Sequence, residues 1–207
     1  MITIYCLIKE FIKSKSSKKE HKLSEISDSE VLFLGYLAVS DFNENYKKAH
    51  YYGMGMNLVT KIKYSRFIRR LNKLESVIEE LFYFLSQICM KINASQTYSV
   101  DSFPVEIYQI QREKRSRLWK DTSLKSYNAS KKKYFYGFKV HMVVTTNQEP
   151  ISVYISEGKV HEIEASYEVI PTIPKDSIVI GDKGYISGNL EDSLAQLGIE
   201  LSALKRS

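Results

Sequence analysis

The spacing of apolar residues changes once along this chain, near residue 95, and the change limits the folds open to it. Before it, apolar residues recur at intervals of three and four, as on one helix face: Phe67, Leu71, Leu74, Ile78, Leu81, Leu85 and Ile88. After it, apolar residues alternate, as on one face of a strand: Phe138, Val140, Met142 and Val144. We therefore expect a mostly helical region over residues 1–94 and a sheet-containing domain over 95–207.

The helical region contains a clear start signal. Ser27, followed three residues later by Glu30, forms a capping box, in which each side chain accepts a hydrogen bond from the other residue's backbone N–H. This predicts a helix over about 28–40. The periodic segment 65–92 predicts one long amphipathic helix or two joined ones.

Strand and helix patterns alternate after residue 95. We expect strands around Val100 and over 136–146, 150–158, 177–182 and 199–205, and helices over 162–170 and 189–197. In the strand over 150–158, one face should carry Ile151, Val153 and Ile155, and the other Ser152, Tyr154 and Ser156. This order predicts an α/β fold with a mixed sheet and flanking helices.

Composition excludes several classes of protein. The longest apolar run, VLFLGYLAV at 31–39, is far below the roughly 20 residues that span a bilayer. The first ten residues show neither the basic segment nor the cleavage site of a secretion signal. Two cysteines, Cys6 and Cys89, make neither a disulfide framework nor a zinc pattern. We therefore expect a cytoplasmic protein without a membrane partner.

Two aspartates occupy similar settings. Asp101 follows YSV and Asp182 follows SIVIG, so each is the first charge after a strand-like run. If the two strands lie side by side in one sheet, both carboxylates reach the same edge, where a divalent cation would relieve their repulsion. Mg²⁺ prefers such oxygen ligands, and two ions about 4 Å apart can promote phosphodiester cleavage. The alternative is that each aspartate only forms a turn or caps a helix.

A basic segment lies between the two aspartates. The segment from Gln111 to Lys139 contains ten lysines and arginines and two acids, so its net charge is +8. The whole chain has a net charge of +6, so the rest of the chain sums to about −2. Lysine and arginine neutralise phosphates, and aromatic rings stack on bases, which predicts nucleic-acid binding. The alternative is a solvated loop or an edge strand protected by lysines. The candidate contacts are Arg112, Lys114, Arg115, Arg117, Trp119, Lys120, Lys131, Lys132 and Lys133.

His161 is followed directly by Glu162. A histidine beside an acid can be a metal ligand or a general base. We favour a supporting role for His161, in which it holds a turn or a neighbouring ligand by hydrogen bonds. His141, between Val140 and Met142, is expected on the exposed face of its strand and is assigned no function.

Four motifs together resemble a known family: VDSFPVEI, KKKYFYGFKVHMVVTTNQEPISV, EGKVHE and VIGDKGYIS. They resemble the bacterial insertion-sequence transposases of the acidic-triad (DDE) class, in the IS4-like superfamily and the branch with a DSFPV motif around the first acid. The resemblance covers about 100–205, and the stretches LSDSEVL and YSRFIRRLNKL in the helical region also look similar.

The resemblance implies an RNase H-like catalytic domain with Asp101 as first acid and Asp182 as second. It implies Mg²⁺ (or Mn²⁺) as cofactor, and double-stranded DNA, both element ends and target, as partner. It also implies a homo-oligomer on DNA, in the bacterial cytoplasm at the nucleoid. The family's HD signature matches His161 and Glu162, with a conservative change at the second position. The helical region would bind element ends or pair protomers.

The resemblance also implies a third acid, a glutamate on a helix after the fifth strand. Glu191 and Glu200 come too early to match it. We therefore expect a C-terminally truncated transposase whose third acid lies beyond residue 207, with weak or absent activity. The alternative is a non-catalytic DNA-binding fragment that inhibits or accompanies a full-length transposase.

Overall fold

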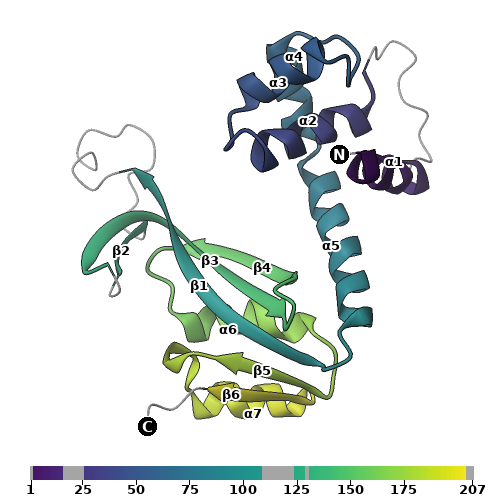
Figure 1. The fold of residues 1–207 in the computed structure, drawn as a ribbon. Helices are drawn as coiled ribbons and strands as arrows, with labels where there is room; N and C mark the ends of the chain where they lie inside the picture. Colours follow the sequence, from purple (N-terminus) through teal and green to yellow (C-terminus); the bar gives the residue numbers. More distant parts are fainter. Residues whose placement is uncertain (1, 16–25, 109–123, 129–130, 204–207) are drawn as a thin grey trace. The chain divides into compact units, whose positions relative to one another are not determined.

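A computed structural model describes residues 2–15, 26–108, 124–128 and 131–203 (Figure 1). The chain divides into two compact units, residues 1–82 and 83–207. The division falls inside a helix, whereas the boundary expected at 94/95 falls between that helix and the first strand. Each unit is described by itself below.

The first unit is helical. Its elements are α1 (Ile2–Lys15), α2 (Asp28–Ser40), α3 (Tyr46–Gly55), α4 (Tyr64–Lys73) and the first part of α5 (Glu75–Ile92). The predicted capping box is confirmed, since the Ser27 hydroxyl accepts from the backbone of Glu30 and the Glu30 carboxylate accepts from the backbone of Ser27. The periodic segment 65–92 forms two helices, which meet at the buried Leu74.

Apolar side chains from α2, α3 and α4 form the core of this unit. The best buried of them are Val31, Leu34, Leu37, Ala49 and Phe67. Gly53 allows α3 to approach α2 closely, because a Cβ at this position would lie 2.4 Å from a methyl carbon of Leu34.

The second unit is built on a six-stranded mixed sheet. Its strands are β1 (Thr97–Tyr108), β2 (Lys125–Asn128), β3 (Lys133–Thr145), β4 (Pro150–Glu157), β5 (Ser177–Gly181) and β6 (Ile199–Ala203). The order is β2-β3-β1-β5-β6. β4 pairs with residues 138–144 of β3, which follow the part of β3 that pairs with β2. β1 is antiparallel to β3 and parallel to β5, which is parallel to β6. This order agrees with the RNase H-like arrangement, and the predicted α/β fold class is confirmed.

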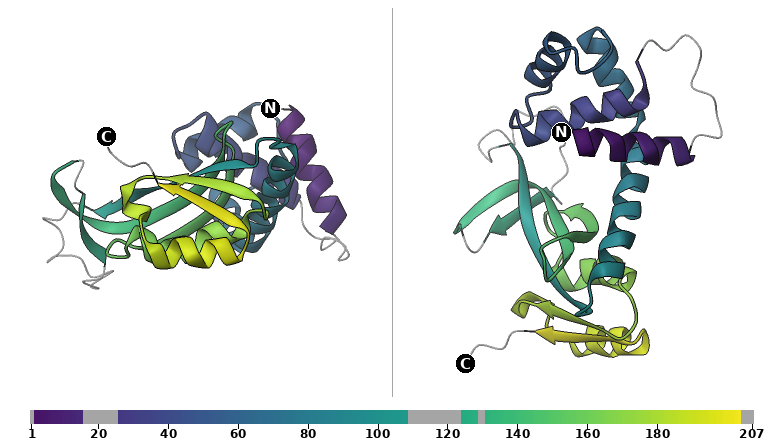
Figure 2. Two further views of the ribbon diagram at one scale, coloured as in Figure 1. Left: turned by 90° about the horizontal axis from the view of Figure 1, so that it is seen from below. Right: turned by 45° about the vertical axis from the view of Figure 1, so that its right-hand side comes forward.

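Two helices cover one face of the sheet (Figure 2). The helices are α6 (Glu162–Val169) and α7 (Gly188–Gln196), and their buried side chains share a core with Tyr98, Val143 and Val179 of the strands. The 3-10 turns η3 (Ile170–Thr172) and η4 (Lys183–Tyr185) complete this layer.

The opposite face of the sheet exposes apolar side chains within the described part of this unit. Phe138, Val140, Met142 and Val144 share this face, as predicted from their alternation. Phe103 of β1 and Ile155 of β4 lie on it too, and they are 47% and 62% exposed.

One prediction about β4 is wrong. Val153 and Ile155 share the open face, but Ile151 is buried on the covered face. The cause is a β-bulge: Ser152 pairs with Val143, Pro150 pairs with Val144, and Ile151 is the extra residue between them. A bulge shifts the alternation by one residue, so side chains before it change face.

His141 is also placed differently from the expectation, since it is completely buried on the covered face. Its Nε2 lies 2.9 Å from the Ser156 hydroxyl, which itself donates to the Glu157 carbonyl. Nε2 therefore donates to Ser156, and the buried Nδ1 has no hydrogen-bond partner within the described residues. Burial, followed by the charge of Lys139, lowers the His141 pKa to about 4.

β2 is an element that the sequence pattern did not predict. It pairs with the first four residues of β3, where Tyr127 and Tyr134 pack edge to face with ring centroids 5.1 Å apart.

In the part of the chain that the structure describes, no helix has the length and apolar character needed to cross a bilayer.

Candidate active site

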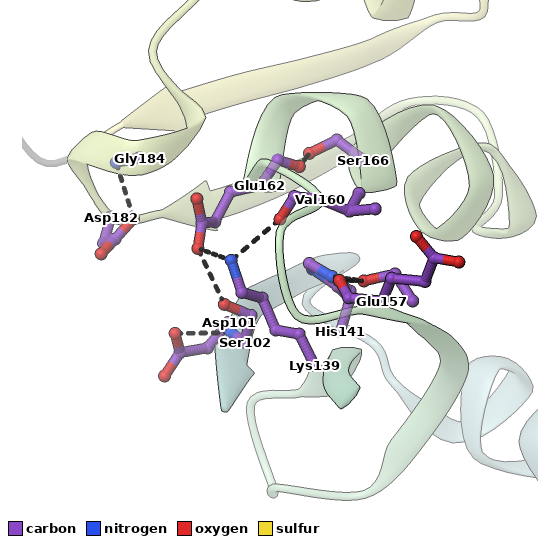
Figure 3. A network of polar contacts seen from close by, with 11 residues as sticks. Asp101, Ser102, Lys139, His141, Glu157, Val160, Glu162, Ser166, Asp182 and Gly184 are labelled. Atoms are coloured by element: carbon purple, nitrogen blue, oxygen red, sulfur yellow. Dashed lines mark hydrogen bonds and ion pairs between the residues drawn. The ribbon is translucent and has the colours of Figure 1, made fainter. Parts of the chain in front are cut away.

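Asp101 lies on the central strand β1 and is exposed (Figure 3). Its neighbours Val100 and Ser102 point to the covered face, so Asp101 points to the open one. One carboxylate oxygen accepts a hydrogen bond of 2.7 Å from the backbone N–H of Ser102.

Asp182 follows β5 directly and begins the η4 turn. Its Oδ1 accepts a 2.8 Å hydrogen bond from the backbone N–H of Gly184. A Cβ at Gly184 would lie 3.0 Å from that same oxygen, so glycine keeps this turn close to the carboxylate. Asp182 is thus a cap of a short helix, as the simpler alternative predicted, and it also remains exposed for a second role.

The register of β1 and β5 places the two aspartates side by side. The last paired residues are Ser99 and Ile180, and the two strands run parallel. Asp101 and Asp182 each stand two residues further along, so continuing this register by two residues brings them to the same level, with Asp182 in the turn that follows β5. Neighbouring strands lie about 4.8 Å apart, a separation that a divalent cation can bridge. Both carboxylates lie on the same side of the view in Figure 3.

Glu162, the first residue of α6, forms a polar network beside the two aspartates. Its Oε1 lies 3.0 Å from the Lys139 ammonium and accepts a 3.2 Å hydrogen bond from the Ser102 hydroxyl. The Lys139 ammonium also donates to the Val160 carbonyl at 2.9 Å. Burial opposes ionisation of Glu162, but its own backbone N–H and these two partners outweigh burial and lower its pKa. Figure 3 shows this network next to Asp101.

Tyr185 is a buried tyrosine whose pKa is affected by the same three carboxylates. Its side chain is completely buried, and its ring packs where a Cβ at Gly181 would lie. Burial raises the pKa of its hydroxyl, and the charges of Asp101, Glu162 and Asp182 raise it further. The hydroxyl has no hydrogen bond of normal geometry within the described residues, although the Ser102 hydroxyl is close enough to oppose the shift.

His161 and Glu162 have different places in the site. His161 caps α6 with its backbone, is exposed, and makes no capping hydrogen bond with its side chain. Its neighbour Glu162 contacts Lys139 and Ser102, which are 23 and 60 residues away along the chain. No local pattern marks that network, because its three members meet only in the folded sheet.

Only part of the basic segment can be placed. Arg112, Lys114, Arg115, Arg117, Trp119 and Lys120 lie outside the described residues. Lys131 and Lys132 form the exposed turn between β2 and β3, and Lys133 begins β3 with an ion pair of 2.7 Å to Glu106. Lys133 is nine residues from Met142, the partner of Asp101, which corresponds to about 30 Å of strand. The structure therefore does not bring these lysines to the two aspartates.

The donor set of Asp101 and Asp182 fits Mg²⁺ or Mn²⁺. Both side chains are exposed carboxylates, and such ions take one or two carboxylates and complete their shell with water or substrate oxygens. Among the described residues, no group of three or more His, Cys, Asp or Glu is arranged to hold a metal. Glu200 pairs with Ile178, four residues or about 13 Å before the level of Asp182, and does not join the pair.

The solved structures that are similar to this chain include two transposase complexes. A piggyBac transposase synaptic complex with hairpin DNA is 12% identical, with a TM-score of 0.43, over 97% of this chain and 47% of that one. A Mos1 transposase paired-end complex with the left transposon end is 11% identical, with a TM-score of 0.28, over 93% of this chain and 65% of that one. The chain thus spans less than two thirds of either protein. These TM-scores are too low to support an assignment.

The family comparison is decisive. No curated protein sequence matches the chain. The family described as "Transposase DDE domain" matches residues 91–207, more than half of the chain, and both aspartates lie within the match. The chain therefore belongs to the transposases with a DDE domain.

Proposed function

We propose that this chain acts in the transposition of a bacterial insertion sequence, as a transposase that cleaves DNA and transfers strands. The observation that supports the proposal is the parallel register of β1 and β5, beyond whose last paired residues, Ser99 and Ile180, Asp101 and Asp182 each stand by two positions. In this proposal the two carboxylates hold Mg²⁺ or Mn²⁺, which would activate the attacking oxygen and stabilise the leaving oxygen of a phosphodiester. Duplex DNA, both element ends and target, is the proposed partner of a homo-oligomer.

The network around Glu162 supports the two carboxylates. Ser102 follows Asp101 directly, and its hydroxyl is held by Glu162, which is held in turn by Lys139. A Cβ at Gly184 would lie 3.4 Å from Cγ of Glu162, so the same side chain also packs against the turn after Asp182. Glu162 thus contacts the surroundings of both aspartates, and we propose that it fixes their relative position.

A direct measurement of Mn²⁺ binding tests the site without depending on cleavage. We expect Asp101→Asn and Asp182→Asn each to weaken Mn²⁺ binding at least tenfold in titrations followed by electron paramagnetic resonance. Asp192→Asn is the matched control, since Asp192 is an exposed acid on α7. Unchanged Mn²⁺ binding in both site variants would show that the metal assignment is wrong.

The second test measures DNA cleavage. Nicking of supercoiled plasmid with Mg²⁺ or Mn²⁺ should be lower by orders of magnitude in Asp182→Asn than in the wild type, because the variant lacks a proposed metal ligand of the cleavage site. Nicking that is equal in the wild type and Asp182→Asn would contradict the proposal.

A non-catalytic role is the second candidate. It is favoured by the lack, among the described residues, of a group of three acids arranged to hold a metal. A fragment of this kind would bind element DNA and inhibit or accompany a full-length transposase. Duplex binding in a gel-shift assay, without nicking under either metal, would favour this role over catalysis.

A further inference from the structure

The hydrogen-bonded ladder between β1 and β5 ends before it reaches the two aspartates. Asp101 stands two residues beyond the last paired residue of β1, and Asp182 begins the η4 turn. Contacts other than this ladder are therefore needed to hold the two carboxylates at a fixed separation. The three pairs of the ladder are Thr97–Ile178, Tyr98–Val179 and Ser99–Ile180.

Tyr185, the last residue of η4, is placed to make such a contact. Its side chain is completely buried in the core of the helix-covered face, together with Val100 of β1 and Val179 of β5. A Cβ at Gly181 would lie only 3.1 Å from Cγ of Tyr185. Because Gly181 has no side chain, the tyrosine ring packs directly against the end of β5.

The Tyr185 hydroxyl is buried and has no hydrogen bond of normal geometry with any described residue. A buried donor without a partner is costly, so the groups near it need to be identified. Burial acts most strongly on its pKa, and the charges of Asp101, Glu162 and Asp182 follow. The Ser102 hydroxyl acts on it too, at hydrogen-bonding range. Ser102 and Tyr185 therefore face each other as a loosely bonded pair of hydroxyls.

The direction of this hydrogen bond follows from the other partner of Ser102. A serine hydroxyl has a single proton, and Ser102 donates it to Oε1 of Glu162 at 3.2 Å (Figure 3). The Ser102 oxygen can therefore only accept from Tyr185. The result is a chain of donors from Tyr185 through Ser102 to Glu162, whose carboxylate is also paired with Lys139.

We propose that Tyr185 is a positioning residue of the candidate metal site, and that its hydroxyl ties the η4 turn to β1 through Ser102. Asp182 begins that turn, and Asp101 lies on that strand next to Ser102. The inference rests on the proposed function, in which the two aspartates hold Mg²⁺ or Mn²⁺.

The physical reason is the repulsion between the two aspartates. Two carboxylates that lie close together repel each other when no metal is bound. A contact behind them that holds their backbones in place opposes this repulsion, so that less free energy is spent on ordering the site when the metal binds. In this proposal Tyr185 contacts neither the metal nor the DNA.

The test measures the Mn²⁺ affinity of the full chain by electron paramagnetic resonance. Tyr185→Phe is the test variant, because it removes the hydroxyl and keeps the ring. Tyr98→Phe is the matched control, since Tyr98 is buried in the same core and its hydroxyl also has no partner among the described residues. Tyr98 stands three residues, or about 10 Å of strand, before Asp101. Urea unfolding measures the stability of both variants separately.

We expect the two variants to differ in Mn²⁺ affinity. A hydrogen bond of ordinary strength corresponds to roughly two- to tenfold in an equilibrium constant. Tyr185→Phe should therefore weaken Mn²⁺ binding about fivefold, and Tyr98→Phe less than about twofold. A hydroxyl that serves folding alone would shift the urea midpoint and leave the Mn²⁺ affinity of the folded chain unchanged, which would contradict the proposal.

A double variant tests whether Tyr185 acts through Ser102. Ser102→Ala should weaken Mn²⁺ binding at least as much as Tyr185→Phe, because it also removes the contact to Glu162. Tyr185→Phe/Ser102→Ala should bind Mn²⁺ as Ser102→Ala does, since the tyrosine has no acceptor left to hold. Ser102→Thr keeps a hydroxyl and should retain most of the affinity. Losses that add in the double variant would show that the two hydroxyls act independently.

The remaining outcomes separate this inference from the proposed function. Equal Mn²⁺ affinities of Tyr185→Phe and Tyr98→Phe would overturn the inference. If Asp101→Asn and Asp182→Asn weaken Mn²⁺ binding while Tyr185→Phe does not, only the inference fails. If the wild type binds no Mn²⁺, or if both aspartate variants bind it normally, the proposed metal site fails and the inference fails with it.

Discussion

The two units each contain a partly buried glutamate with a lowered pKa, and their surroundings differ. Glu30 in the helical unit accepts only from neutral donors, the backbone and hydroxyl groups of Ser27 and Thr60. Glu162 in the sheet unit is paired with the Lys139 ammonium and lies beside Asp101. In both, burial opposes ionisation and the hydrogen bonds outweigh it.

The comparison teaches that a lowered pKa does not by itself mark an active site. Glu30 joins the start of α2 to the loop before α4, which is a structural task. Glu162 joins β1, β3 and the start of α6 at the point where two exposed carboxylates meet. The two glutamates are distinguished by the charged and exposed acidic residues around Glu162, and not by the direction of the pKa shift.

The largest expected change in folding stability occurs at acid pH and is confined to the sheet unit. His141, next to Lys139 and Glu162, has a pKa of about 4 in the folded chain against 6.5 without the fold. Between these two pH values the unfolded chain therefore binds more protons than the folded chain. The free energy of unfolding is highest above about pH 6.5 and decreases as the pH falls, by about 3 kcal/mol at pH 4. Urea unfolding from pH 7 to 4 measures this loss.

The control for that experiment is His141→Gln, which does not titrate in this range. It should be less stable at neutral pH, with a flatter dependence on pH between 6.5 and 4. A wild-type curve that is flat between these values would show that His141 titrates normally. Glu162 adds to the acid loss only below about pH 4.5, because its pKa is lowered.

Removal of the cation from the Glu162 network should have the next largest effect. Lys139→Met leaves a carboxylate without its partner in a site where the lysine side chain is only 14% exposed. We expect a loss of about 2 kcal/mol, less than for a fully buried pair, because Glu162 is partly solvated. Lys139→Met/Glu162→Gln should recover part of it in urea unfolding, since no unpaired charge remains. No recovery in the double variant would indicate that packing of the lysine stem dominates.

A smaller effect is expected from the Glu30 network. Ser27→Ala removes the hydroxyl that accepts from the backbone of Glu30 and should cost about 1 kcal/mol, confined to the helical unit. Hydrogen exchange measures this loss locally, with faster exchange in the first turn of α2 and unchanged exchange in β1. Ser27→Asp should behave like the wild type, because aspartate is an equally good cap.

The smallest effect concerns a surface ion pair. Lys13 and Glu10 on α1 are bonded at 3.0 Å, but their side chains are 61% and 71% exposed. Lys13→Ala should change the stability by less than about 0.5 kcal/mol in the same urea assay. A loss comparable with that of Lys139→Met would mean that exposure does not separate the two pairs.

Local patterns predicted the elements around the two aspartates well. The apolar run before Asp182 and the β-branched and aromatic stretch around Val100 became the parallel strands β5 and β1, because residues of this kind favour a half-buried position in a sheet. The capping box predicted the start of α2, since all of its contacts lie within four residues.

The features that the sequence patterns predicted wrongly or did not predict depend on contacts between residues far apart in the chain. Ile151 changed face because a bulge added one residue to β4. β2 formed because β3 offered it an edge, although its own four residues carry no strong strand pattern. The Glu162 network unites β1, β3 and α6, and its members share no sequence spacing.

The alignment of β1 with β5 has a consequence for how the length of this chain can vary. The two aspartates are level because each stands two residues beyond Ser99 and Ile180. One residue inserted or deleted between Ile180 and Asp182 would turn the second carboxylate to the helix-covered face. The turn at 146–149 has no such constraint, since it carries neither acid. Tolerance of insertions and deletions should therefore be lowest in the few residues on either side of the last paired position.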